Sequence, residues 1–196
     1  MQAIRERETV PVASGPEGDD ERLIARIASG DRAALGQLYT TYQHPLFRYL
    51  CQLTPDRGLA EEILQDTLVA VWKGAAGFQG RSRVLTWLIG IARRQAHNSL
   101  RRHGLPSADS SQLDLIADSA PNPEERALAG ADRQSLLAAV NSLAPIHREV
   151  LALNFVQGFS YQEIAALLEV PEGTVKSRLS NAKRALRALL DAEHRV

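Results

Sequence analysis

Apolar residues recur every three or four positions along most of the chain, the spacing that places them on one side of an α-helix. In the first half, this pattern predicts helices over 31–43, 46–53, 56–73 and from Ser82 or Thr86 to about Arg102. Asp31 and Asp56 precede two of these helices and are suited to cap them. Pro45 is expected to interrupt the first helix or to open the next one, because proline lacks a backbone N–H.

The helical pattern stops between Gly104 and Pro123, where glycine, serine, aspartate and three prolines gather. This stretch is longer than a usual connection inside one domain. Helical periodicity resumes over 124–141, 145–157, 160–168 and 171–189. We therefore predict an all-α fold of two small helical domains joined by a flexible acidic linker. The expected division is a disordered segment at 1–19, a first domain at 20–103, the linker at 104–123 and a second domain at 124–191.

Composition narrows the possible functions. The stretch up to Asp20 has no apolar core, so no secretory signal is expected, and no apolar run is long enough to cross a bilayer. The single cysteine, Cys51, lies in an apolar stretch and is expected to pack. The histidines lack metal-ligand spacing, and glycine-rich phosphate loops are absent from the sequence. We expect a cytoplasmic protein that is not an enzyme, needs no cofactor or metal and does not insert into membranes.

The formal net charge is zero, but the charges are not evenly spread. Residues 81–103 carry six arginines and no acidic residue, and 172–190 carry five basic residues against Glu172 alone. Between them, 104–127 carries five acidic residues against Arg126. Two basic segments flanking an acidic connector favour binding to a phosphate backbone despite the overall balance.

The second domain carries the pattern of a helix-turn-helix. Ser160 and Glu163 have the spacing of a capping box, and Pro171 is suited to open the following helix. In that helix, Val175, Leu179, Ala182 and Leu186 fall on one side. The opposite side is polar and basic, as expected of a helix that enters the major groove. A helical bundle with a solvated basic face is the alternative, which the small residues Gly173, Ser177 and Ser180 disfavour.

The strings 157–165 and 170–179 resemble region 4 of the extracytoplasmic-function (ECF) sigma factors. The resemblance implies binding to the minus-thirty-five promoter element and to the flap of the polymerase beta subunit. The implied DNA contacts are Thr174, Lys176, Ser177, Arg178, Ser180, Asn181, Lys183 and Arg184. The chain departs from the family at Glu169, where glycine is common. A left-handed backbone there would cost about 1 kcal/mol, unless the turn avoids that geometry.

Two strings in the first domain resemble region 2 of the same family. The string 60–72 is similar to the surface that grips the clamp of the polymerase beta-prime subunit, which implies contacts from Glu62, Gln65, Asp66 and Val69. The string 78–88 is similar to the part that captures the non-template strand of the minus-ten element. The implied contacts, with the helix that follows, are Gly80, Arg81, Ser82, Arg83, Val84, Arg93 and Arg94.

Some assignments within the first domain stay open. Arg94 stands where the family commonly has asparagine, and Gly90 where a basic residue is frequent, which leaves the bases that are read undefined. Trp87 is expected to pack in the core rather than to stack on a base. The acidic linker is expected to be a soluble spacer, with mimicry of nucleic acid inside the polymerase cleft as the alternative.

The resemblance implies an alternative sigma factor that binds core RNA polymerase and directs it to promoters, and it makes an anti-sigma factor an expected partner. One alternative is a helix-turn-helix regulator that acts without polymerase, although the first domain shows no receiver or effector pattern. Another is an interaction protein or small helical enzyme whose basic faces are only solvated. Polymerase dependence and salt-sensitive DNA binding would separate these readings.

Overall fold

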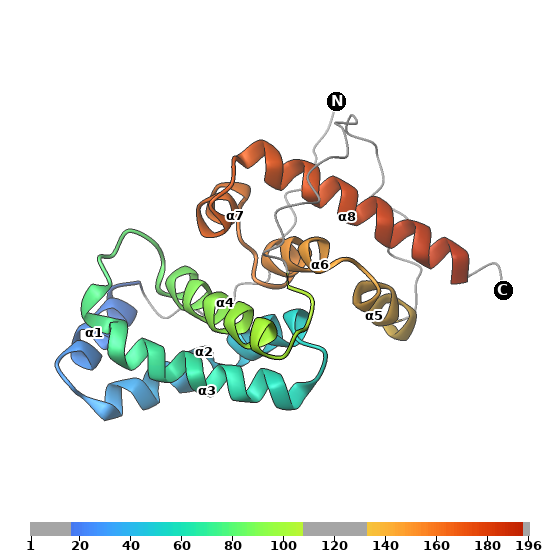
Figure 1. The fold of residues 1–196 in the computed structure, drawn as a ribbon. Helices are drawn as coiled ribbons and strands as arrows, with labels where there is room; N and C mark the ends of the chain where they lie inside the picture. Colours follow the sequence, from blue (N-terminus) through green and yellow to red (C-terminus); the bar gives the residue numbers. More distant parts are fainter. Residues whose placement is uncertain (1–16, 108–132, 194–196) are drawn as a thin grey trace.

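The structure, a computed structural model, describes residues 17–107 and 133–193, and its regular secondary structure within them is helical. The first group of helices is α1 (Glu17–Ala28), α2 (Arg32–Leu53), α3 (Arg57–Gly74) and α4 (Val84–Arg102), with a 3-10 turn, η1 (Ala75–Gly77), after α3. The second group is α5 (Arg133–Asn141), α6 (Pro145–Leu151), α7 (Tyr161–Leu168) and α8 (Glu172–Glu193), with a π-helical turn, η3 (Ala152–Val156), after α6. In Figure 1, α4 lies on the side of the first group that faces the second. The predicted all-α class is confirmed.

Helix α2 runs through Pro45 without a break, so the expected interruption is wrong. Its buried residues, Ala34, Leu38, Tyr42, Leu46, Tyr49, Leu50 and Leu53, continue along one face on both sides of the proline. Burial of this apolar face offsets the hydrogen bond that proline cannot donate. The predicted cap is confirmed, since the Asp31 carboxylate accepts from the backbone N–H groups of Ala33 and Ala34 at 2.9 and 3.1 Å.

Two helix starts in the first group differ from expectation. Helix α1 was not predicted, and it begins inside the segment that was expected to be disordered. Helix α4 begins at Val84 rather than at Ser82 or Thr86, and Arg83 before it forms no side-chain cap. Asp56 caps α3 as predicted, accepting from the backbone N–H of Leu59 at 2.9 Å. Residues 1–16 and most of the predicted linker lie outside the described residues.

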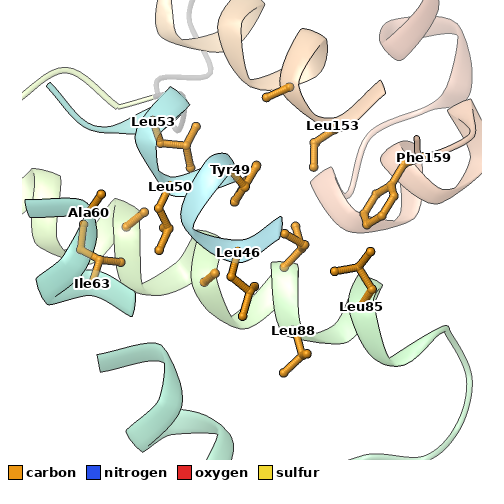
Figure 2. Close-up of a cluster of buried hydrophobic side chains, with 14 of the residues drawn as sticks. Leu46, Tyr49, Leu50, Leu53, Ala60, Ile63, Leu85, Leu88, Leu153 and Phe159 are labelled. Carbon is orange, nitrogen blue, oxygen red and sulfur yellow. The ribbon is translucent and has the colours of Figure 1, made fainter. Parts of the chain in front are cut away.

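The buried side chains of the two groups meet. Figure 2 shows Leu153 and Phe159 of the second group opposite Tyr49 and Leu85 of the first. Each of these four side chains is at most 5% exposed. A continuous apolar core therefore joins two groups that the sequence pattern separates.

The second group contains the predicted helix-turn-helix, formed by α7 and α8. The capping box is present, because Ser160 Oγ accepts from the backbone N–H of Glu163 while the Glu163 carboxylate accepts from the backbone N–H of Ser160 at 2.8 Å. The predicted inner face of α8 is buried at Val175, Leu179, Ala182 and Leu186.

The turn between α7 and α8 passes through Glu169 in the left-handed conformation, with φ +56° and ψ +42°. Among the described residues, it has the only positive φ at a non-glycine position. The turn thus does not avoid the left-handed geometry, and a side chain with a Cβ is strained there.

We predict that Glu169→Gly raises the free energy of unfolding by about 1 kcal/mol, because glycine adopts this conformation without a steric cost. Urea denaturation followed by circular dichroism measures the change. Glu169→Ala removes the same carboxylate but keeps a Cβ, so it should give no such gain. If Glu169→Gly is no more stable than Glu169→Ala, the left-handed backbone at this position is not strained.

Candidate nucleic-acid and polymerase interface

The outer face of α8 carries the eight side chains predicted to contact duplex DNA. Lys176, Ser180 and Arg184 are exposed, and the other five are half-buried at its margins. Arg184 donates to Asn181 Oδ1 at 3.0 Å, and Ser177 Oγ donates to the carbonyl of Thr174 at 3.0 Å. These bonds hold polar groups in place on the face that a helix-turn-helix turns toward the major groove.

Two of the basic residues on α8 have neighbours in the second group. Lys176 Nζ lies 3.1 Å from Glu172 Oε1, one helical turn earlier, in an exposed pair that contributes little stability. Lys183 Nζ lies 5.3 Å from the ring centre of Phe155, which is 58% exposed. Sequence reasoning did not single out Phe155, although it falls within the predicted helix 145–157.

The loop before α4 brings together the predicted contacts for single-stranded DNA. Gly80 adopts a left-handed φ of +66°, and Arg81, Ser82 and Arg83 are exposed. Val84 differs, since it is 5% exposed and packs into the core. Trp87 is half-buried with its ring centre 5.2 Å from that of Phe78, at the base of the same loop.

The two arginines of this region that lie nearest the second group are paired with carboxylates from it. Arg83 donates from Nε to Glu163 Oε1 at 2.9 Å, and its guanidinium lies 5.5 Å from the ring centre of Phe159. Arg93 donates from Nε to Glu149 Oε1 at 2.8 Å. Arg94, one position further along α4, is exposed.

Glu149 is the most deeply buried carboxylate of this contact, with its side chain 2% exposed. Besides the bond from Arg93, it accepts from the Tyr49 hydroxyl at 2.9 Å, and His97 Nε2 lies 3.7 Å away. Burial raises the pKa of Glu149, but His97, Arg93 and Tyr49 outweigh that effect, so its pKa lies below the usual value. The carboxylate therefore stays ionised inside the protein.

The residues predicted to grip polymerase lie on α3. Glu62, Gln65 and Val69 are exposed, and Val69 is a large apolar side chain with 52% of its surface open. Asp66 is half-buried and lies 3.7 Å from the guanidinium of Arg102. All four are on the part of α3 that does not pack into the core.

The chain matches the family model for sigma-70 region 2 over residues 38–105 and the model for sigma-70 region 4 over residues 133–186. The ECF RNA polymerase sigma-E factor of Escherichia coli (strain K12) is 30% identical to it over 176 residues, covering 85% of this chain and 92% of that protein. The RNA polymerase sigma-H factor of Pseudomonas aeruginosa is 28% identical over 179 residues, covering 85% and 91%.

Solved structures with the same fold include the sigma factor RpoE from Bartonella quintana in complex with the anti-sigma factor NepR. It has a TM-score of 0.62 and 29% identity, covering 80% of this chain and 96% of that one. CnrH in complex with the cytosolic domain of CnrY has a TM-score of 0.65 and 25% identity, covering 88% and 97%. The chain belongs to the ECF sigma factor family.

As an ECF sigma factor, the chain directs RNA polymerase to promoters, and the reading as a regulator that acts without polymerase is not favoured. Sigma factors are non-enzymatic transcription initiation factors. Among the helices that the structure describes, none is long and apolar enough to cross a membrane. The same described residues contain no cluster of metal-ligating side chains.

The lowered pKa of Glu149 predicts an acid-sensitive stability. Because the folded pKa lies below the usual 4.5, the carboxylate stabilises the structure fully above pH 4.5, and this contribution is lost as pH falls through the folded pKa. Glu149→Gln should lower the free energy of unfolding by about 2 kcal/mol at neutral pH, which is the scale of a hydrogen bond to a charged group.

The difference in melting temperature between wild type and Glu149→Gln should therefore narrow as pH is lowered from neutral toward the acid limit of folding. Differential scanning fluorimetry across that range measures it. Glu172→Gln removes a surface carboxylate from the same group of helices and should stay close to wild type throughout. A difference for Glu149→Gln that is constant with pH would show that its ionised form is not what stabilises the fold.

Proposed function

We propose that the two groups of helices divide the promoter between them, with 20–103 acting as region 2 and 124–191 as region 4. The observation that carries this proposal is the pair of basic surfaces, one on the loop and start of α4 and one on α8, each on a separate sigma region. Their separation along the chain suits recognition of two promoter elements by one protein. Since polymerase works in the cytoplasm, we place this factor there.

We assign the minus-thirty-five element to the outer face of α8. Lys176 and Arg184 are exposed and basic, which suits phosphate contacts or guanine, and Asn181 can form paired hydrogen bonds with adenine. The other residues of this surface are Thr174, Ser177, Arg178, Ser180 and Lys183. The small side chains among them let the helix approach the floor of the groove.

We assign the melted minus-ten element to the loop before α4 and to the outer side of that helix. The exposed Arg81 and Arg94 suit phosphates of a single strand, and the open backbone around Gly80 and Ser82 suits an extruded base. Arg83 and Arg93 complete this surface. Val84 is excluded because its side chain is part of the core.

The exposed surface of α3 is our candidate for the contact with the beta-prime clamp of polymerase. Val69 provides an apolar centre, while Glu62, Gln65 and Asp66 surround it with polar groups. The flap of the beta subunit is the expected second contact, on region 4. An anti-sigma factor is also an expected partner, since the two solved structures described above pair a related fold with NepR or the cytosolic domain of CnrY.

Changing Gln65 and Asp66 together to alanine is expected to lower transcription with sigma-free core polymerase at least about tenfold, because the polar rim of the clamp contact is lost. The measurement is RNA synthesis from candidate promoters, including premelted templates. The matched control is Gln37→Ala with Asp19→Ala, which removes the same two groups from α2 and α1. If the Gln65 and Asp66 variant keeps full activity, the exposed surface of α3 does not bind the clamp.

Lys176→Ala and Asn181→Ala should weaken promoter binding in different ways. Lys176→Ala removes a phosphate contact, so it should weaken holoenzyme binding on all sequences and lower by about 1 the slope of log affinity against log salt concentration. Asn181→Ala removes a base contact, so it should relax the preference at one base pair. Binding to minus-thirty-five variants, followed at several salt concentrations, separates the two effects. If neither variant alters binding, the minus-thirty-five element is not read by this face.

A further inference from the structure

The second group of helices is docked against the first through the arginines that we assign to minus-ten DNA. Region 4 contributes two carboxylates to this contact, Glu163 to Arg83 and Glu149 to Arg93, with closest N–O distances of 2.6 and 2.8 Å. Each arginine binds an anionic oxygen in the way it would bind a phosphate. The contact therefore fills anion-binding groups of region 2 with acidic groups of region 4.

The Glu149 side of the contact is closed to solvent. The side chain of Arg93 is 20% exposed and that of Glu149 is 2% exposed, and Tyr49 of α2 completes the shell around the carboxylate. Glu149 occupies the Nε–H of Arg93, so a phosphate that uses this donor competes with the carboxylate, and the negative charge of Glu149 opposes the approach of any second anion. Binding of a strand at Arg93 and docking of region 4 therefore compete for the same donor.

Apolar and backbone contacts extend the docking along the same helices. Phe159, 1% exposed, lies beneath the guanidinium of Arg83. A Cβ placed on Gly90 of α4 would lie 3.3 Å from Leu167 of α7, and Gln157 donates to the carbonyl of Pro45 at 3.0 Å. Gly90 is the position where a basic residue is frequent in the family, and the close approach of α7 gives a reason for the glycine.

We propose that this docked arrangement is a self-inhibited state, in which the carboxylates of Glu149 and Glu163 hold Arg93 and Arg83 in place of the minus-ten strand and must leave before promoter DNA is captured. The proposal rests on the assignment of those arginines to the minus-ten element. The apparent affinity for single strands is then lowered by the fraction of molecules that are open. Any variant that loosens the docking should raise that affinity.

The test uses the full chain with Cys51→Ser and single cysteines at Ala76 and Ala166, two exposed positions on η1 and α7, labelled for energy transfer. A fluorescent poly-dT strand is the DNA probe, and its affinity is measured by anisotropy. Wild type should show high transfer that falls as the strand binds. Glu149→Gln should lower transfer without DNA and tighten binding about fivefold or more.

Two further variants separate docking from folding and from charge. Gly90→Gln places a neutral side chain against α7 without touching either carboxylate, so it should open the chain and tighten binding in the same direction. Asp191→Asn removes one negative charge from region 4 at the end of α8, beside Arg187, and should leave both readouts at the wild-type value. Circular dichroism confirms that each variant is folded.

Equal transfer and equal affinity in wild type, Glu149→Gln and Gly90→Gln would overturn the self-inhibited state, as would a wild-type chain whose transfer does not change when it binds poly-dT. The transcription assay with core polymerase is run on the same samples. If wild type is active in that assay while Glu149→Gln and Gly90→Gln change neither energy transfer nor affinity, the proposed self-inhibition is wrong and the sigma function still holds. If Arg83→Ala and Arg93→Ala leave single-strand binding and transcription intact, the minus-ten assignment itself fails.

Discussion

The arrangement of the two sigma regions depends on the ionised carboxylate of Glu149. A charge that is almost fully buried is costly unless its oxygens are bonded to donors, and here the donors come from the other region, from Tyr49 and Arg93. Removing any one of these groups leaves the others buried with an incomplete set of partners. This geometry is therefore favoured over any orientation that buries Glu149 away from Tyr49 and Arg93, because its charge would then lack these donors.

Glu163 shows how one side chain can serve both local and long-range structure. Its carboxylate caps the first helix of the helix-turn-helix through Ser160, and the same group binds Arg83 of the other region. The burial around it raises the pKa of Glu163, but the bonds from Ser160 and Arg83 outweigh this and leave the pKa below its usual value. Helix initiation in region 4 and contact with region 2 are consequently coupled through one charge.

Local pattern in the sequence predicted most of the helices and the inner and outer faces of α8. Helical spacing identifies a buried face, and caps such as Asp31, Asp56 and Ser160 act within a few residues of their own position. The continuity of α2 through Pro45 was not predictable in this way, because packing on both sides of the proline decides it. The burial of Val84 likewise depends on the start of α4, which no side-chain cap marks.

The docking of the two regions could not be predicted, because it joins residues such as Tyr49 and Glu149 that are far apart in sequence and carry no periodic signal. Charge pattern pointed to arginines for DNA, but it did not show that acidic groups of the same chain would meet them. Complementarity of this kind appears only when side chains from different helices are placed in space.

The π-helical turn η3 lies inside region 4, between α6 and the helix-turn-helix. A π turn contains an extra residue compared with an α turn, and one residue corresponds to about 100° of rotation around a helix axis. Phe159 and Gln157 follow this turn and reach region 2. A single-residue insertion or deletion at this point would shift Gln157 and Phe159 out of register with Pro45 and Arg83, so the length of this short segment sets which side chains of region 4 meet region 2.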